Sequence, residues 1–470
     1  MNTRIAARSR TLLRAGTAVG GAPRGSPPKT AVRTSVTTTL MAWVFIVYMT
    51  VPFDIFDQRG IGGTAAAYEV NPVARLIKLV LLALSFFLVV RQSAKAIQLL
   101  RHLNKGFVVF LIVVPLSYVW SISPSDTLTR YISIIIEVLV CSAICLVGWH
   151  KTRFQDLLRP CITALLVGSI IFGLTSPELA IEHGTGTLLN SWHGLATQKN
   201  EFGQLSAFGV ILWLHGWLTR AVSLWKAIVF GSLSLLCVLL SRSSTSLLST
   251  LLVICFLLLL LRSPPSLRRY MPYIITIYAI TVITYAVAVL QLVPGLEFIL
   301  QPIAALTGKD MTFSNRATIW EIIKAHIQLS PLIGSGYGAY WVGPVPTSPS
   351  YVFLGRMYFY PSESHNGYLE IVNDLGFMGL IILVSYLIAY IRQCLRLFKV
   401  DRPTGALFLA FFFQQAIMNL SESTWLTVNS AFLFAIMTFA TVSVARHELD
   451  NGAVNMTRST RSGTIPGSRR

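Results

Sequence analysis

Long apolar runs alternate with short polar connections along most of this chain. A helix that crosses a bilayer needs about 20 mostly apolar residues. Helices are the expected form because they satisfy their own backbone hydrogen bonds in lipid. The pattern predicts an all-α, polytopic membrane protein with about twelve transmembrane helices, at residues 38–53, 73–90, 107–120, 131–148, 161–174, 203–218, 221–240, 246–261, 271–293, 366–390, 404–420 and 424–444.

One polar connection is much longer than the others and lies between the ninth and tenth predicted spans. We call residues 294–365 the long loop. The expected order is a basic tail at 1–35, helices 1–9 within 36–293, the long loop, helices 10–12 within 366–445, and a second tail at 446–470. Both tails are rich in Arg, Ser and Thr, which is typical of disordered segments.

The charge distribution adds an orientation. The formal net charge is +19, yet most of the 38 Lys and Arg residues fall in alternate connections. Cytoplasmic connections carry such an excess. We therefore expect both termini in the cytoplasm, the long loop on the periplasmic face, contact with anionic membrane lipid, and no nucleic-acid partner. The six cysteines lie in or beside spans and suggest neither a disulfide framework nor a thiolate metal site.

The long loop contains a predicted helix with a cation at its start. Thr318 and Glu321 fit a capping box, and the helix is expected to run to about Leu329, before Pro331. Arg316 would lie just before this helix or in its first turn, a position that favours binding of an anion such as phosphate. Gly334, Gly336 and Gly338 follow and predict a flexible turn.

His365 is the strongest catalytic candidate, because it opens an apolar span from the periplasmic side beside Asn366. Neutral imidazole accepts a proton from a hydroxyl. Arg242, in SRSSTS, is either an interfacial side chain that snorkels or a phosphate ligand. Lys199 and Asn200 begin the sixth span, where Lys199 is either a membrane anchor or a further positive charge for the same cavity.

Further polar and aromatic side chains in the long loop suit a carbohydrate. Asp310 would orient Arg316 or cap a turn, and Trp320 follows Arg316 by one helical turn. Tyr337 belongs to an aromatic set that suits sugar faces, although interfacial aromatic belts have the same composition; the others are Tyr340, Trp341, Tyr358 and Tyr360.

Metal motifs, phosphate-binding glycine loops and nucleotide fingerprints are absent from the sequence. An enzyme with this sequence would need no cofactor or metal and would use an already activated donor. Arg and Lys side chains near the bilayer suit a donor whose leaving group is a membrane-held diphosphate. Hydrogen bonds to charged groups contribute about 1.5–3 kcal/mol each.

The loop region resembles the O-antigen ligase/polymerase superfamily, in particular its Wzy-type exopolysaccharide polymerases. Three motifs carry this resemblance: GKDMTFSNRATIW, PLIGSGYGAYW and SHNGYLEIVNDLGFMGL. The earlier motifs ATQKNEFG and LLSRSSTSLL are also similar, so the resemblance covers roughly residues 185–390. Many relatives have Gly where this chain has Asn315, before the loop arginine.

The resemblance implies a metal-independent, GT-C-type glycosyltransferase of the bacterial inner membrane, with an undecaprenyl-diphosphate-linked glycan as donor. It implies His365 as base, Arg242 and Arg316 as diphosphate ligands, and Lys199 as a supporting contact. Asn200, Asn366, Asp310, Trp320 and Tyr337 complete the expected substrate-binding set.

Several functional alternatives stay open. A polymerase would use a second lipid-linked repeat as acceptor, and a ligase would use lipid A core. A polysaccharide transporter or flippase would share the topology, although internal repeats of the kind common in transporters are not evident. A non-catalytic partner of polysaccharide export and chain-length proteins is a further alternative.

Overall fold

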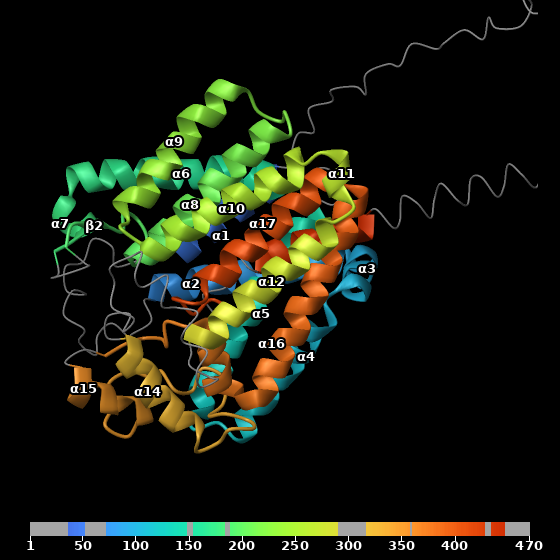
Figure 1. The fold of residues 1–470 in the computed structure, drawn as a ribbon. Helices are drawn as coiled ribbons and strands as arrows, with labels where there is room; N and C mark the ends of the chain where they lie inside the picture. The colour runs from blue at the N-terminus through green and yellow to red at the C-terminus, as the bar shows by residue number, and fades with distance from the viewer. Residues whose placement is uncertain are drawn as a thin grey trace, which may run out of the picture. The chain divides into compact units, whose positions relative to one another are not determined.

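The computed structural model describes residues 36–51, 72–147, 154–183, 189–289, 316–357, 360–427 and 434–446 (Figure 1). Within these ranges, almost all regular structure is helical. The helices are α1 (Val36–Thr50), α2 (Pro72–Arg91), α3 (Ser93–His102), α4 (Lys105–Leu116), α5 (Pro124–Val147), α6 (Phe154–Thr175), α7 (Pro177–Ala180), α8 (Lys199–Leu218), α9 (Leu224–Leu240), α10 (Ser244–Arg262), α11 (Pro265–Arg268), α12 (Met271–Val289), α14 (Arg316–Ile327), α15 (Val352–Met357), α16 (Gly367–Val400), α17 (Arg402–Met418) and helix Phe434–Arg446, with 3₁₀ turns at Ser117–Val119 and Pro349–Tyr351.

Each predicted apolar span overlaps one of these helices, so the protein is a polytopic, helical membrane protein. Among the described residues, α5, α6, α10 and α16 are long and apolar enough to cross a membrane. The pair α2–α3, bent by 95°, gives a fifth candidate, and five further apolar helices are shorter. The count of twelve spans therefore stays a prediction. The departure from an all-α fold is a small antiparallel sheet of β1 (Ile181–Glu182) and β2 (Ser191–Trp192).

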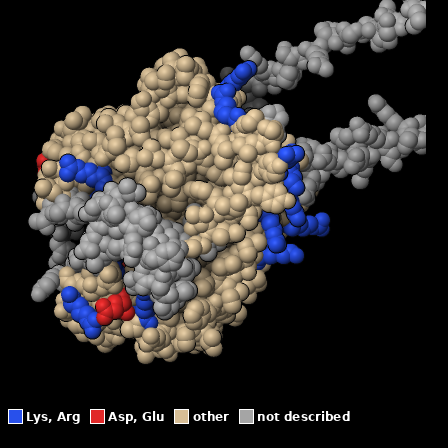
Figure 2. All heavy atoms as spheres, in the orientation of Figure 1, with Lys and Arg blue, Asp and Glu red and all other residues tan. Residues whose placement is uncertain are grey.

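The distribution of charge agrees with membrane insertion. On the face drawn in Figure 2, lysine and arginine side chains lie mainly toward the region of α3 and α11 and toward the region of α7, α14 and α15. Few charged side chains lie on the visible surface between these regions. An uncharged band of this kind is what a bilayer core requires.

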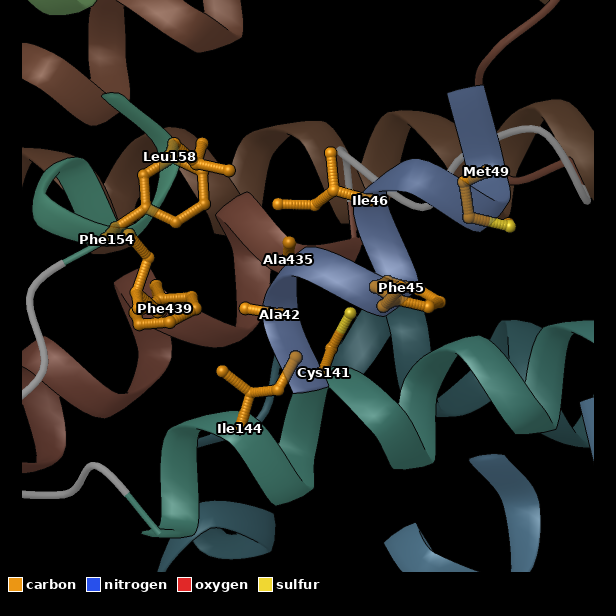
Figure 3. A pocket seen from close by; sticks show the side chains of 11 residues that line it. Ala42, Phe45, Ile46, Met49, Cys141, Ile144, Phe154, Leu158, Ala435 and Phe439 are labelled. Carbon is orange, nitrogen blue, oxygen red and sulfur yellow. The ribbon is translucent and has the colours of Figure 1, made fainter. Parts of the chain in front are cut away.

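Helix α17 lies at the centre of the packing, because its residues from Gly405 to Met418 are all buried. A helix that is apolar on every side belongs in a core. It contacts α8, α10 and α16. A neighbouring pocket of about 30 Å³ lies between α1, α5, α6 and helix Phe434–Arg446 (Figure 3). Its lining side chains carry only carbon and sulfur, so this pocket offers no polar chemistry.

Helix α16 is interrupted at Gly376, whose φ of 63° and ψ of −160° are not helical. The turn after α14 fills the interruption. The amides of Phe377 and Met378 donate to the carbonyls of Pro331 and Leu332, at 2.8 and 3.1 Å. In return, the amide of Gly336 donates to the carbonyl of Asp374 at 2.9 Å. The break therefore fixes the long loop to the helix through main-chain hydrogen bonds.

The structure gives the course of the glycine turn and corrects one expectation about the helix before it. Gly334, Gly336 and Gly338 have positive φ values of 69°, 96° and 62°. The predicted helix begins at Arg316 and ends at Ile327, so Thr318 lies inside its first turn and is not the N-cap. The helical hydrogen-bond pattern starts earlier than the capping-box spacing suggested, and it places Arg316 at the helix start.

Replacing Gly376 with Ala should destabilise the protein. The left-handed conformation alone costs about 1–3 kcal/mol for a residue with a side chain, and a Cβ would overlap the backbone of Leu332 and Ile333. Gly355→Ala is the matched control, because a Cβ there meets nothing within 4 Å. The midpoint of thermal unfolding of the full-length protein in detergent should be clearly lower for Gly376→Ala than for wild type, and unchanged for Gly355→Ala. Equal midpoints for the two variants would contradict this account.

Candidate active site

A buried carboxylate, that of Glu422, joins distant parts of the chain in the connection after α17. Its Oε1 accepts a hydrogen bond from Arg316 Nη2 at 3.0 Å and from Asn200 Nδ2 at 2.6 Å. Its Oε2 lies 3.6 Å from His365 Nδ1. The Glu422 side chain is 5% exposed, so these partners replace water. We call Asn200, Arg316, Glu363, His365 and Glu422 the Glu422 cluster.

His365 lies between two carboxylates. Its Nδ1 is 2.9 Å from Glu363 Oε1, an ion-pair distance without the alignment of a hydrogen bond. The His365 backbone has a φ of 50°, a conformation that is uncommon for residues other than glycine. The preceding residue is held by Trp320, whose Nε1 donates to the carbonyl of Ser364 at 3.0 Å. Packing thus fixes the imidazole against the two acids.

The start of α16 is attached to the connection that carries Glu422. The amide of Gly367 donates to the carbonyls of Asn419 and Glu422 at 2.9 and 3.0 Å. The hydroxyls of Ser364 and Ser423 are 3.1 Å apart. Because these contacts involve neighbouring residues on both segments, they keep His365 and Glu422 together.

Two carboxylates beside one imidazole favour the imidazolium form. Burial alone would lower the pKa of His365, but contact with Glu363 and Glu422 raises it to about 10. Burial raises the pKa of Glu363 to about 7 against the opposing effect of His365. Burial also acts to raise the pKa of Glu422, yet His365 and Arg316 hold it below its ordinary value. The neutral His365 expected from the sequence is therefore not the form favoured by these surroundings at neutral pH.

A polar pocket of about 40 Å³ adjoins Glu363, and we call it the acidic pocket. Two further carboxylates, one arginine and several hydroxyl groups line it. The lining residues are Arg130, Tyr337, Gly338, Ser362, Glu363, Glu370, Asp374, Ser423 and Thr427.

Of the residues expected to form the site, the structure brings together Arg316, His365 and Asn200. Trp320 supports the backbone beside His365. Asn366 is fully buried and caps α16, since its Oδ1 accepts from the amides of Tyr368 and Leu369 at 3.1 Å each. Its position therefore suits a structural role better than substrate contact.

The aromatic set is more buried than expected. Tyr337 is 2% exposed, and its hydroxyl donates to the carbonyl of Leu426 at 2.8 Å. Tyr340 and Trp341 are also buried. These rings pack the loop onto the helices and present no open face to a sugar. A role of Tyr337 in substrate binding stays a prediction that this packing does not favour.

The remaining expected residues are Arg242, Lys199 and Asp310. Arg242 is exposed after α9, and its Nη1 donates to the carbonyl of Leu189 at 2.9 Å; the contacts of the described residues do not join it to Glu422. Lys199 opens α8 directly before Asn200. Asp310 lies outside the described residues.

Sequence reasoning missed both acids that touch His365. Glu363 was visible two residues before the histidine, but surface acids are common beside a membrane. Glu422 stands in the short polar stretch SEST between two apolar runs. The available signal was an acid in a connection expected on the same face as the long loop.

Glu363, His365 and Glu422 also offer ligand atoms within 4.8 Å of one another, an arrangement that is able to hold a metal ion. Arg316 and Asn200 already occupy Oε1 of Glu422. The expectation of a metal-free site therefore needs an experiment.

Comparison with known proteins gives two matches. Residues 227–384 match the model of the family described as O-antigen ligase (Wzy_C). The exopolysaccharide production protein ExoQ of Rhizobium meliloti (strain 1021) is 28% identical over 340 residues, covering 69% of this chain and 74% of that protein.

The charge on His365 predicts how stability depends on pH. Because its folded-state pKa is raised above the unfolded value of about 6.5, its stabilising contribution is complete below that pH and is lost as pH rises toward about 10. The thermal midpoint of the wild-type protein should fall between pH 7.5 and 9.5, with a smaller fall for His365→Gln. Parallel curves for the two proteins would show that His365 carries no such charge.

Proposed function

We propose, from the match of residues 227–384 to the O-antigen ligase family, that this chain is a membrane glycosyltransferase that polymerises undecaprenyl-diphosphate-linked repeats into exopolysaccharide or O-antigen. The observation that supports this most is the Glu422 cluster, which places the loop cation Arg316 and His365 beside a shared carboxylate. Family membership implies a lipid-linked glycan as substrate. The repeat unit as donor and a second repeat as acceptor are our proposals.

The reaction joins an acceptor hydroxyl to the anomeric carbon of the donor. The bond from that carbon to the diphosphate oxygen breaks, and the electron pair leaves with the diphosphate. The acceptor proton passes to a base in the Glu422 cluster. Arg316 and His365 would stabilise the diphosphate, since charge-assisted hydrogen bonds contribute about 1.5–3 kcal/mol each. Arg242 and Lys199 are proposed as further diphosphate contacts.

The proposed placement follows the charge pattern. Both termini and residues 1–35 and 446–470 would lie in the cytoplasm, and the long loop would cover the periplasmic side of the inner membrane. The lipid-linked donor would reach the cluster from the bilayer. Polysaccharide export or chain-length proteins would be further partners.

A ligase that transfers the glycan to lipid A core is the second candidate, because the matching family is described as O-antigen ligase. The name of ExoQ, exopolysaccharide production protein, favours the polymerase instead.

Arg316→Ala and His365→Ala should each lower glycan transfer in cells at least about 100-fold, because each removes a charge partner from the cluster. Arg356→Ala is the matched control, since this arginine is exposed on α15 and its ion pair with Glu321 spans 3.9 Å. Lipid-linked glycans should be extracted and sized after membrane insertion has been verified. Single repeats indicate a lost polymerase, and long unattached polymers a lost ligase. Normal products in both variants would reject the site.

Transfer should continue without a metal. Dialysis of the purified protein against EDTA is expected to leave the rate within about twofold, because Arg316 and His365 would supply the positive charge that a metal brings elsewhere. Loss of transfer on chelation, with recovery on adding Mg²⁺ or Mn²⁺, would show instead that transfer needs an ion, and Glu363, His365 and Glu422 would be its candidate ligands.

A further inference from the structure

Two helices that pack against each other, α4 and α16, carry rows of exposed apolar side chains. On α4 this row includes Val109, Ile112 and Leu116. On α16 it consists of Phe377, Ile381, Val384 and Ile388. The spacing of three or four residues places each row on one side of its helix. In a protein that spans a membrane, exposed apolar surface of this kind faces lipid.

The exposed apolar surface continues beyond the ends of these helices. It includes residues of the connection from α4 to α5 and residues that follow α14, up to the glycine turn. Leu329, Leu332 and Val119 are 81%, 70% and 82% exposed. We call the whole set the apolar edge; its members are Tyr118, Val119, Ile122, Leu329, Leu332 and Ile333.

Hydrogen bonds join the two parts of the apolar edge. Trp120 Nε1 donates to the carbonyl of Ile333 at 2.9 Å. The amide of Ile122 donates to the carbonyl of Ser335, also at 2.9 Å. The amide of Phe377, the first residue of the row on α16, donates to the carbonyl of Pro331 at 2.8 Å. The apolar edge therefore adjoins the row on α16 as well as the end of α4.

The sequence around the apolar edge carries no charge. Residues 106–125 and 328–355 contain no Asp, Glu, Lys, Arg or His. A soluble domain has about 25% charged residues, so a stretch as long as 328–355 that faced water would carry about seven. Tyr118 and Trp120 belong to the residue types that are enriched where a membrane meets water. This composition suits contact with lipid.

The length of α16 indicates how deep the apolar edge lies. After the break at Gly376, the charge-free part of the helix is 377–391, and Arg392 follows. At 1.5 Å per residue this part covers about 22 Å, whereas the hydrocarbon core of a bilayer is about 30 Å thick. A layer of that thickness therefore extends past Phe377 to the level of the glycine turn.

The backbone of the glycine turn also suits this position. Non-helical backbone at membrane depth needs its polar groups paired within the protein. Four carbonyls of the turn accept hydrogen bonds from α16 or from the connection before α5, namely those of Pro331, Leu332, Ile333 and Ser335. Three of its amides donate to main-chain carbonyls, namely those of Gly334, Ser335 and Gly336.

We propose that the apolar edge lies in the bilayer, where it contacts the acyl chains of the leaflet at this end of the helices. The glycine turn is then a segment that enters the membrane without crossing it, and the long loop rests partly in lipid. This inference needs only the membrane-spanning fold and does not depend on glycosyl transfer.

Contact of the edge with lipid limits the position of Arg316. Helix α14 runs from Arg316 to Ile327, two residues before Leu329. A helix of this length is about 18 Å long. With its last turn held at the membrane, its first residue stays close to the bilayer surface, which is where the proposed enzyme would meet a membrane-held diphosphate.

The test measures the fluorescence of single labels on the full-length protein in lipid nanodiscs. Leu332→Cys places a label in the glycine turn and Val119→Cys places one after α4. The matched control is Glu321→Cys on α14, because the Glu321 side chain is 76% exposed. All three carry Cys255→Ser, since Cys255 is exposed and the other five cysteines are buried. Cys255→Ser alone measures background labelling.

Lipid that carries a nitroxide high on its acyl chain should quench the Leu332→Cys and Val119→Cys labels at least about twofold. Iodide dissolved in water should quench these two labels at least about threefold less than the Glu321→Cys label. The Glu321→Cys label should show the opposite preference, because it faces water.

Three results would overturn the proposal. Equal iodide quenching of the Leu332→Cys and Glu321→Cys labels would place the apolar edge in water. Protection of the Leu332→Cys label from both quenchers would show that protein covers the edge. Lipid quenching of the Val119→Cys label alone would leave the glycine turn outside the bilayer. None of these results bears on glycosyl transfer, which is measured separately.

Discussion

The site depends on the pairing of one buried carboxylate. Glu422 is almost inaccessible to water, and an unpaired charge there would be strongly destabilising. Arg316 at the start of α14, Asn200 in the first turn of α8 and His365 before α16 are its partners. Since α8 belongs to the helical body and α14 to the long loop, neutralising this charge requires both parts to be in place. The site is therefore complete only when the loop is packed on the helical body.

A second constraint keeps the loop in position. The interruption of α16 at Gly376 leaves backbone groups without helical partners, and residues 331–336 satisfy them. Buried backbone groups have to be paired, so this attachment is specified strongly. It sets the distance between the end of α14 and the start of α16, and thereby the position of Arg316 relative to His365.

The sequence predicted most of the architecture because apolar runs report burial in lipid directly. Every predicted span overlaps a helix of the described structure, and Arg316 and His365 stood out as polar groups at the edge of such runs. The acids were harder to find. Arg316 and Glu422 are 106 residues apart, and only the tertiary fold shows that they meet. Asn366 and Tyr337 look functional in sequence, but a helix cap and a buried hydroxyl bond account for the same residue types.

The glycine turn has an evolutionary consequence. It is attached to α16 mainly through main-chain amides and carbonyls, which every amino acid except proline provides in full. Side chains on the exposed part of the loop can therefore diverge between relatives without detaching it. A loop held in this way can change its outer side chains while Arg316 and His365 keep their places beneath it.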